Sequence, residues 1–450
     1  MTTIPSCFKA YDVRGKVPGE LNPELAYKIG RAFVQFTGAT SVAVGRDMRL
    51  SGPEICAELI RGLTEQGADV LDIGVVGTEE VYHATFSQGL GGGIMVTASH
   101  NPADYNGMKM VRAEARPISA DTGLMDIGAI AVAGEFETPT RTGNVTEKDL
   151  RPEYAEFLLG QVDVPTLKPF KVVTNAGNGC AGLVVDAIAP SLPFELVSLQ
   201  HEPDGTFPNG VPNPLLIENR ELTAKAVRDS GADFGVAWDG DFDRCFLFDE
   251  NGNFIESYFL ISLIAETLLE REQGAAIVYD PRLTWATVET VSNAGGKPVQ
   301  SKSGHAFMKD VMREEDAIYG GEMSAHHYFR SFAYCDNGNL PWLFIAELMS
   351  KTGKSLSQLI GEREAAYPIS GEINSRIEDP GGKIAEIRAK YEPDCESIDL
   401  MDGIGINFAD WRFNLRKSNT EPLVRLNVEA RGDKALCEAK TAELLAILRG

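Results

Sequence analysis

The sequence predicts an α/β protein: three similar mixed-sheet α/β domains, followed by a smaller C-terminal α+β domain. Short runs rich in valine and isoleucine alternate with helical patterns three times along the chain, which is typical of mixed or parallel sheets covered on both faces. After about residue 400 the pattern changes to antiparallel strands followed by one helix, which favours a separate α+β domain.

The elements follow from these patterns in chain order. The first domain is expected to contain strands at 41–45, 70–73 and 93–97 and a helix over 53–67. The second is expected to contain strands at 171–174, 194–199 and 233–238 and a helix over 181–189. In the third we expect strands at 275–279, 298–301 and 317–320, with helices over 284–294 and 305–314. The tail predicts strands at 404–408, 411–415 and 423–430 and a helix over 433–448.

Stretches rich in proline, glycine and charge mark the expected domain boundaries. They lie near residues 147–152, 249–253 and 367–371. We therefore expect domains at 1–148, 149–251, 252–367 and 368–450.

The chain is acidic, with 42 Lys and Arg against 65 Asp and Glu and a net charge of −23. This balance argues against nucleic acids and anionic membranes as partners, because both need a positive footprint. A local cluster of cations can still bind a small phosphorylated substrate. The start of the chain shows no secretory signal, and the seven cysteines are too widely spaced for a disulfide framework, so we expect a cytoplasmic protein.

A polar loop follows the last strand of each α/β repeat, at residues 97–102, 239–244 and 321–326. Ligands in open α/β sheets bind outside the carboxyl ends of the strands. The three loops are therefore expected to face one cleft.

The first loop contains Ser99, followed by His100, Asn101 and Pro102. Pro102 disfavours helix at Asn101, and the composition favours a tight exposed loop that can present the Ser99 hydroxyl to a cleft. Taken alone, a Ser-His pair is common in ordinary turns. The surrounding residues do not form the G-x-S-x-G elbow of α/β-hydrolases.

The second loop carries Asp239, Asp241 and Asp243 at alternating positions, and Arg244 ends it. Such carboxylates converge on a hard cation when the backbone loops around it. An EF-hand is excluded because Arg244 and Asn251 stand where that loop needs Gly and Glu, so Mg²⁺ is the better fit. The alternative is a solvated acidic turn, although the apolar flanks on both sides favour the edge of a core.

Two further segments offer groups for a sugar phosphate. Residues 320–327 supply Glu322, Ser324 and His326, which suit sugar hydroxyls. Residues 416–422 concentrate cations, hydroxyls and a turn-forming Asn, which suit a phosphate clamp. A charged hairpin tip is the alternative for the second segment.

Together these segments resemble the α-D-phosphohexomutase family, and the resemblance covers nearly the whole chain. Residues 10–15 resemble the family's N-terminal motif, 97–102 its phosphoserine loop and 239–244 its metal loop. Residues 322–326 resemble its sugar-binding loop and 416–422 its phosphate-binding loop. The family implies four domains arranged around a central cleft.

The resemblance also implies residue roles. It implies that Ser99 carries the phosphoryl group, that Lys109 is the general acid/base, and that Mg²⁺ is held by the three loop aspartates and a phosphoserine oxygen. The other catalytic residues it implies are His100, Arg14, Arg244 and His326. The substrate-binding residues it implies are Tyr11, His305, Glu322, Ser324, Arg416, Ser418, Asn419 and Thr420.

The implied reaction moves a phosphoryl group between O1 and O6 of a hexose phosphate through a hexose 1,6-bisphosphate. The form of residues 320–327 looks most like bacterial phosphomannomutases that supply GDP-mannose and polysaccharide synthesis, with glucose phosphates as the alternative substrate. A sugar phosphatase and a non-catalytic sugar-phosphate binder are more remote alternatives. Hexose phosphates are the expected partners, and the chain is expected to be a monomer or homodimer. Three residues depart from the family pattern: Ala325, where many relatives have Gly, the second histidine His327, which is not general in the family, and Glu79, where relatives often have Pro.

Overall fold

The computed structural model describes residues 3–417 and 423–450, which divide into two compact units. The first unit comprises the residues up to Phe254 together with Ser331–Thr352. The second comprises Ile255–Arg330 and Gly353–Gly450. Each unit is described by itself.

The first unit begins with a six-stranded sheet in the order β1-β5-β4-β2-β3-β6. Its strands are β1 (Val13–Lys16), β2 (Ser41–Arg46), β3 (Asp69–Val75), β4 (Gly92–Val96), β5 (Tyr105–Arg112) and β6 (Val145–Glu147). Strands β4, β2, β3 and β6 run parallel, whereas β5 and β1 are antiparallel to their neighbours. The helices are α1 (Pro23–Thr37), α2 (Gly52–Glu65), α3 (Thr78–Ser87) and α4 (Leu124–Ala133).

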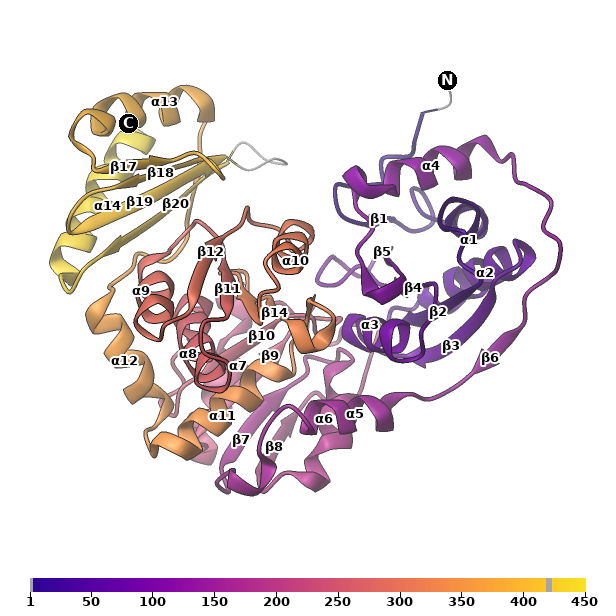
Figure 1. Cartoon of the computed structure of the whole chain (residues 1–450), viewed down its shortest axis with the longest axis horizontal. Coiled ribbons are helices and arrows are strands. Elements are labelled where there is room, and N and C mark those ends of the chain that lie inside the picture. The colour runs from indigo at the N-terminus through magenta and orange to yellow at the C-terminus, as the bar shows by residue number, and fades with distance from the viewer. Residues whose placement is uncertain (1–2, 418–422) are drawn as a thin grey trace. The chain divides into compact units, whose positions relative to one another are not determined.

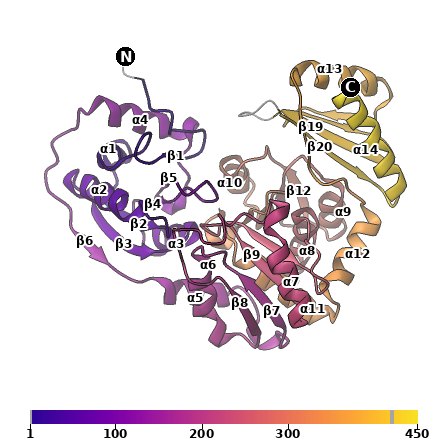
Figure 2. The ribbon, with the colours of Figure 1, turned by 180° about the vertical axis from the view of Figure 1, so that it is seen from behind.

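Both faces of this sheet are covered, as the sequence predicts. Successive strand residues point to opposite faces, so Val42 and Val44 join one apolar core with α1, α2 and α4. Ala43 and Met95 instead join a second core with α3. Helix α1 begins where the Asn22 side chain accepts the Leu25 N–H at 2.9 Å. Figures 1 and 2 show these helices from opposite sides.

A second sheet of the same unit has the order β10-β9-β7-β8, and β10 is its antiparallel strand. Its strands are β7 (Lys171–Asn175), β8 (Glu195–Leu199), β9 (Phe234–Trp238) and β10 (Cys245–Phe248). The helices of this part are α5 (Arg151–Leu159), α6 (Ala181–Ile188) and α7 (Glu221–Ser230). The returning segment of the unit adds β15 (Cys335–Asp336) and α11 (Leu340–Thr352).

The second unit also contains an α/β part, in which strands pair in the order β12-β11-β13-β14. They are β11 (Ala276–Tyr279), β12 (Lys297–Gln300), β13 (Tyr319–Gly321) and β14 (His327–Phe329). The helices are α8 (Ser257–Arg271), α9 (Trp285–Asn293), α10 (His305–Glu314) and α12 (Leu356–Ala366). Strands β12, β11 and β13 are parallel, and β14 is antiparallel to β13.

The C-terminal part of the second unit is an antiparallel sheet in the order β16-β20-β19-β18-β17. Its strands are β16 (Ile373–Arg376), β17 (Ser397–Asp399), β18 (Ile404–Asn407), β19 (Trp411–Lys417) and β20 (Leu423–Ala430). Helices α13 (Pro380–Tyr391) and α14 (Lys434–Arg449) pack on this sheet (Figure 1). Phe413, Leu426 and Leu444 lie in the core between them.

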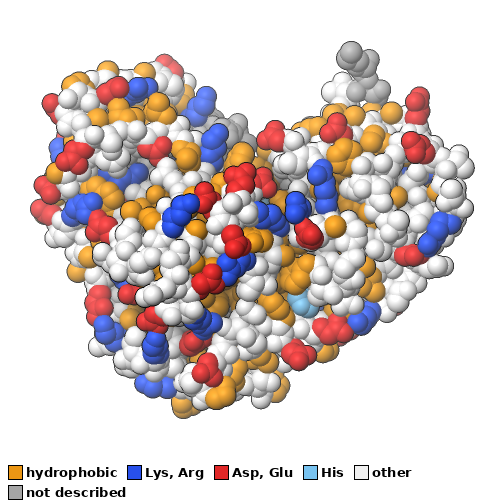
Figure 3. Space-filling model, viewed as in Figure 1, with side chains coloured by type: hydrophobic (Ala, Val, Ile, Leu, Met, Phe, Trp, Pro, Cys, Tyr) orange, Lys and Arg blue, Asp and Glu red, His pale blue; other side chains and the backbone are white. Residues whose placement is uncertain are grey.

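The predicted helix over 305–314 and the predicted strand at 423–430 are confirmed residue for residue, and the other predicted elements are found with small shifts at their ends. Gly92 begins β4, one residue before the predicted start at Gly93, and an added Cβ at Gly92 would meet Phe33 at 2.7 Å. Among the described residues, no helix is long and apolar enough to cross a bilayer. On the face drawn in Figure 3, acidic and basic side chains lie interspersed.

Candidate active site

The Ser99 loop begins where β4 ends, and it holds the serine side chain inside the first unit. Ser99 is 1% exposed, and its φ of +50° lies in the left-handed region that non-glycine residues rarely adopt. Its Oγ donates a hydrogen bond to Asp239 Oδ2 at 2.9 Å and lies 3.0 Å from His100 Nδ1. The strained backbone therefore aims the hydroxyl at the acidic loop rather than at solvent.

Arg49, which sequence reasoning missed, organises the backbone of this loop. Its terminal nitrogens donate to the carbonyl oxygens of Ser99 at 2.8 Å, Asn101 at 2.7 Å and Pro102 at 2.7 Å. Asp47 accepts from the Arg49 backbone N–H at 3.0 Å. Because a guanidinium offers five donors in a rigid fork, one buried arginine can fix several carbonyls at once.

Arg14, a predicted catalytic residue on β1, also contacts the serine loop. Its Nη1 donates to Asn101 Oδ1 at 2.6 Å, and its Nε donates to Asp12 at 2.8 Å. Tyr11 lies two residues before β1 and is half-buried. The structure thus places Arg14 of the N-terminal motif beside the Ser99 loop.

The acidic loop that follows β9 brings its three predicted carboxylates together. Asp239, Asp241 and Asp243 are all buried, and ligand oxygens from the three lie within 4.8 Å of one another. Lys109 Nζ, which lies on β5, donates to Asp241 at 2.6 Å and to Asp243 at 2.5 Å. Thr78 at the start of α3, another residue that sequence reasoning missed, donates to Asp241 at 2.6 Å.

Charge pairing sets the ionisation of this cluster. Burial raises the pKa of Asp239, but Arg244 and His100 together lower it by more, and the pKa falls to about 2. Arg244 Nη2 donates to Asp239 at 2.7 Å. Burial, reinforced by Arg244, lowers the pKa of His100 to about 4, so this imidazole is neutral at pH 7. Burial lowers the pKa of Lys109, but Asp241 and Asp243 together raise it by more than burial lowers it. The net pKa lies above the usual lysine value, so this side chain is a cation.

The donor set fits a hard divalent cation. Oxygen ligands at this spacing suit such an ion, and one of these oxygens accepts no hydrogen bond from the described residues. Asp241 Oδ1 is buried and has no hydrogen-bond partner among the described residues. A buried acceptor without a partner is costly unless a ligand satisfies it. The acidic trio can therefore bind a metal ion.

In the second unit, the loop after β13 holds Glu322, Ser324 and His326. Glu322 is 2% exposed, accepts the Gly304 N–H at 2.7 Å and accepts the Tyr328 hydroxyl at 2.5 Å. Ser324 Oγ lies 3.1 Å from His326 Nδ1. Burial raises the pKa of Glu322, but His326 and Arg282 lower it overall, to about 2.

Two further residues lie near Glu322 in the chain or in space, His305 and Arg282. His305 is the first residue of α10 and directly follows Gly304, whose N–H the carboxylate binds. Arg282 was missed by sequence reasoning. It pairs with Asp280 at 2.6 Å and lies 3.9 Å from Glu322. Its only sequence signal is a charged residue shortly after β11, at a strand end where ligands gather.

Arg416, predicted to clamp phosphate, lies near the end of β19 and contacts two carboxylates. Its terminal nitrogens lie 3.1 Å from Glu372 and 3.4 Å from Asp402. Ser418, Asn419 and Thr420, which were predicted to act with it, lie outside the described residues.

The predicted residues therefore form one set in each unit. In the first unit, Ser99, His100, Arg244, Lys109 and the three aspartates form one contact network, and Arg14 reaches the serine loop. The second unit holds Glu322, Ser324, His326, His305 and Arg416.

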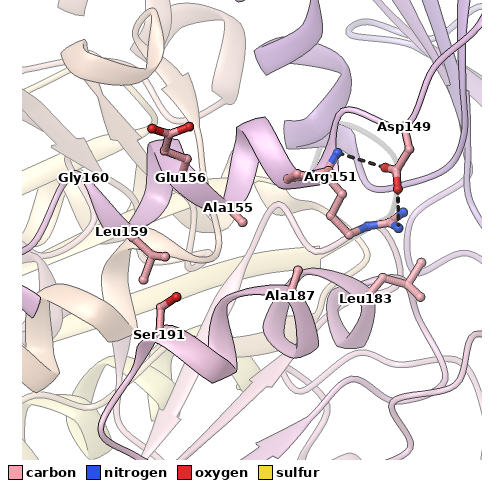
Figure 4. Close-up of a pocket in the computed structure, with 10 residues that line it drawn as sticks. Asp149, Arg151, Ala155, Glu156, Leu159, Gly160, Leu183, Ala187 and Ser191 are labelled. Atoms are coloured by element: carbon pink, nitrogen blue, oxygen red, sulfur yellow. Dashed lines mark hydrogen bonds and ion pairs between the residues drawn. The ribbon is translucent and has the colours of Figure 1, made fainter.

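A different hollow, of about 900 Å³, lies between α5 and α6 (Figure 4). Arg151 on its wall donates its backbone N–H to Asp149 at 3.0 Å and its Nη2 to the Val75 carbonyl at 2.9 Å. The polar groups of Arg151 thus bind the neighbouring backbone and side chains. The residues that line the hollow include none of the predicted site residues.

Matches to known protein families cover nearly the whole chain. Four family models match, described as phosphoglucomutase/phosphomannomutase α/β/α domain I at residues 5–137, domain II at 152–252, domain III at 256–367 and the C-terminal domain at 372–446.

Curated relatives match end to end. The chain is 55% identical to a phosphomannomutase of Salmonella typhimurium, over 98% of this chain and 99% of that protein. It is also 55% identical to a protein of Xanthomonas campestris named phosphohexose mutases, over 100% of both chains.

A solved structure of a phosphoglucomutase/phosphomannomutase family protein from Burkholderia thailandensis has a TM-score of 0.87 and 33% identity, covering 100% of this chain and 98% of that one. The expected fold of three α/β domains and a C-terminal α+β domain is confirmed by these matches. The chain belongs to the phosphoglucomutase/phosphomannomutase family and is an enzyme of the phosphohexomutase class.

Proposed function

We propose that this enzyme interconverts mannose 6-phosphate and mannose 1-phosphate through a phosphoserine at Ser99 and a hexose 1,6-bisphosphate intermediate. The observation that supports it most is the 2.9 Å hydrogen bond from Ser99 Oγ to Asp239, which joins the nucleophile to the acidic trio. The choice of mannose follows the name of the Salmonella relative.

In the proposed first half-reaction, the bond between Ser99 Oγ and phosphorus breaks while a free hydroxyl of the hexose phosphate forms a new bond to phosphorus. The product is the 1,6-bisphosphate and an unmodified Ser99. In the second half-reaction, Ser99 Oγ takes the other phosphoryl group from the intermediate. The enzyme is thereby regenerated, and the phosphate has moved between O1 and O6.

Each half-reaction moves one proton as well as one phosphoryl group. The sugar hydroxyl loses a proton in the first half, and Ser99 Oγ gains one. Lys109 is the proposed relay, since its ammonium can give a proton to the serine oxygen and the neutral amine that remains can then take one from the sugar hydroxyl. Its contacts with Asp241 and Asp243 hold the Nζ beside the acidic loop.

The Asp239, Asp241 and Asp243 carboxylates are proposed to hold Mg²⁺ together with a phosphoserine oxygen. When bound, the ion would neutralise charge on the transferring phosphoryl group. Arg244 and the neutral His100 keep Asp239 ionised and oriented, and Arg14 with Arg49 fixes the serine loop. These contacts keep the reacting atoms in place without reorganisation during transfer.

The second unit is proposed to hold the substrate. Glu322 and Ser324 would contact sugar hydroxyls, with His305 as a further contact, and His326 would act in catalysis. Tyr11, which belongs to the first unit, is proposed as an additional substrate contact. Arg416, Ser418, Asn419 and Thr420 would bind the phosphate that is not being transferred. We propose that mannose 1-phosphate from this reaction feeds GDP-mannose and polysaccharide synthesis in the cytoplasm, by an enzyme that is a monomer or homodimer.

A dual-specificity mutase is the second candidate, and one observation favours it. The Xanthomonas relative, equally similar to this chain, carries the general name phosphohexose mutases. Mannose and glucose differ in the configuration at one carbon, and one carboxylate such as Glu322 can accept from a hydroxyl in either position.

A coupled assay separates these possibilities. Wild type and Ser99→Ala are supplied with mannose 1-phosphate or glucose 1-phosphate and primed with hexose 1,6-bisphosphate. We expect wild type to turn over mannose 1-phosphate and the variant to be inactive, with phosphorylation of Ser99 seen by mass spectrometry of wild type. Equal turnover by the variant contradicts the phosphoserine mechanism, and the ratio of the two wild-type rates identifies the preferred hexose.

A further inference from the structure

The first residue of α3 contacts the acidic loop of the first unit, although the two are 163 residues apart in the chain. Thr78 is fully buried, and its Oγ1 donates a hydrogen bond to Asp241 Oδ2 at 2.6 Å. Its backbone N–H donates to the Asp241 carbonyl oxygen at 3.1 Å. Thr78 therefore holds both the side chain and the backbone of one predicted metal ligand.

The residue before Thr78 allows the loop to approach this closely. An added Cβ at Gly77 would lie 2.0 Å from the ring of Phe242, which stands between Asp241 and Asp243. Phe242 itself has a left-handed φ of +48°. Any side chain at position 77 would displace that ring, so the contact needs glycine. The start of α3 thus fixes the middle of the acidic loop.

The two oxygens of the Asp241 carboxylate have different surroundings. Oδ2 accepts from Thr78 Oγ1 and from Lys109 Nζ, both at 2.6 Å. Oδ1 is buried and has no hydrogen-bond partner among the described residues. Hydrogen bonds of this length from a hydroxyl to a carboxylate are among the strong ones, so they fix the orientation of the carboxylate. The oxygen that remains for a ligand is Oδ1.

Of the two donors on Oδ2, only the hydroxyl is compatible with a bound cation. The Lys109 ammonium is positively charged and repels a divalent ion at the same carboxylate, whereas the Thr78 hydroxyl is neutral. The proposed proton relay also requires Lys109 to serve Ser99 and the sugar. Lys109 Nζ donates to Thr78 Oγ1 at 3.4 Å, and because an ammonium only donates, the hydroxyl proton is left for Asp241.

We propose that Thr78 is a positioning residue of the metal site, whose hydroxyl holds Asp241 Oδ2 so that Oδ1 binds the divalent cation. Carboxylates that bind metal ions are commonly fixed by such hydrogen bonds, and losing the partner weakens metal binding. This inference rests on the proposed function, because the cation is the Mg²⁺ of that function.

Calorimetric titration of Mg²⁺ alone into the full-length protein tests the proposal without turnover. Thr78→Val removes the hydroxyl and keeps the branched shape, and Thr85→Val on the same helix is its control. Thr85 is also buried, but its Oγ1 donates to the Val81 carbonyl at 2.7 Å. We expect Thr78→Val to raise the Kd for Mg²⁺ about tenfold or more. Thr85→Val should leave the Kd within about twofold of wild type, as expected for an independent site.

Thr78→Ser separates the hydroxyl from the rest of the side chain. It restores the donor, so the Kd should return to within about threefold of wild type. A serine variant that binds Mg²⁺ as weakly as Thr78→Val overturns the role of the hydroxyl. If circular dichroism shows Thr78→Val to be unfolded, Thr78→Ala replaces it, with Thr85→Ala as the control.

The outcomes also separate this inference from the proposed function. Equal Kd values for Thr78→Val and Thr85→Val overturn the role of Thr78, while a wild type that converts mannose phosphates keeps the proposed function standing. The proposed function fails instead if wild type with Ser99 intact converts no hexose phosphate. A wild type that binds no Mg²⁺ overturns both the proposed metal site and the role of Thr78.

Discussion

Ser99 Oγ donates a hydrogen bond to Asp239 Oδ2, although the two residues follow strands of two different sheets in the first unit. The contact orders both partners at once. The serine sits at a left-handed φ of +50°, and the aspartate stays ionised beside Arg244. A strained residue pointing at a buried carboxylate is expected at a reactive site rather than in an ordinary turn.

Ser99→Ala and Ser99→Gly should both abolish turnover, because each removes the hydroxyl that is proposed to carry the phosphoryl group. Their stabilities should differ. Glycine adopts φ values near +50° without strain, whereas alanine does not, so the glycine variant should be more stable by about 1 kcal/mol. Urea unfolding of the two variants measures the difference. An alanine variant at least as stable as the glycine variant would show that the left-handed backbone carries no strain.

Lys109→Met should destabilise the protein strongly. Its ammonium is the shared partner of Asp241 and Asp243, and all three side chains are shielded from solvent. Removing one partner of a buried ion pair costs about 3–5 kcal/mol, because the remaining charges lose their compensation. Lys148→Met, which breaks the exposed pair with Glu153, should cost less than about 1 kcal/mol in the same urea titrations. Equal losses in the two variants would contradict a special role for the buried lysine.

Mg²⁺ should raise the melting temperature of wild type, and chelation should reverse the gain, because binding to the folded state stabilises it. The shift should be larger in Lys109→Met, in which no ammonium competes for Asp241 and Asp243. Asp241→Asn should reduce the shift, since it weakens a ligand whose Oδ1 has no other partner among the described residues. Scanning calorimetry with and without Mg²⁺ provides the measurement, and an undiminished shift in Asp241→Asn would place the ion elsewhere.

Sequence patterns found most of the sheet strands and several helices, and they missed other helices for two different reasons. Helix α8 is apolar on nearly all sides, since it is buried around most of its circumference, so no amphipathic period marks it. The sequence of helix α1 contains helix-end signals that the prediction did not use. They are Asn22 as the N-cap, Pro23 in the first turn and Gly38 at the C-terminal end.

The site shows the same division. The motifs brought out the residues whose side chains would perform chemistry, such as Ser99 and Asp241. Arg49 binds backbone carbonyls and Arg282 binds neighbouring carboxylates. Both were missed because those contacts exist only after folding. Isolated arginines outside a motif carry no periodic or spacing signal.

Glu79→Ala should lower both stability and activity, although Glu79 lies outside the predicted site. Its carboxylate is fully buried and accepts the Gly338 N–H at 2.7 Å and a side-chain N–H of Asn339. Gly338 in turn accepts the indole N–H of Trp238, the residue before Asp239, at 2.8 Å. Losing the carboxylate leaves buried donors unpaired, which should cost about 2–4 kcal/mol.

Glu79→Gln should retain most activity, because an amide oxygen still accepts the Gly338 N–H. Glu156→Ala, an exposed change on α5, serves as the control for general effects of losing a glutamate. Assays at saturating Mg²⁺ together with urea titrations separate lost positioning from lost folding. Full activity in a folded Glu79→Ala protein would show that this contact does not position the acidic loop.

The shifted pKa of Glu80 predicts how the stability of the protein depends on pH. Its carboxylate is buried and caps α3 by accepting the Gly77 N–H at 2.9 Å. Burial, only partly offset by Arg151, raises the pKa of Glu80 from 4.5 to about 7. The folded state therefore keeps this proton where the unfolded state has lost it, so the free energy of unfolding falls as pH rises from about 4.5 to 7. Glu80→Gln should remove up to about 3 kcal/mol of that fall. Urea titrations at pH 5 and pH 8 test this, with the exposed Glu147→Gln as control, and parallel slopes for both variants would contradict it.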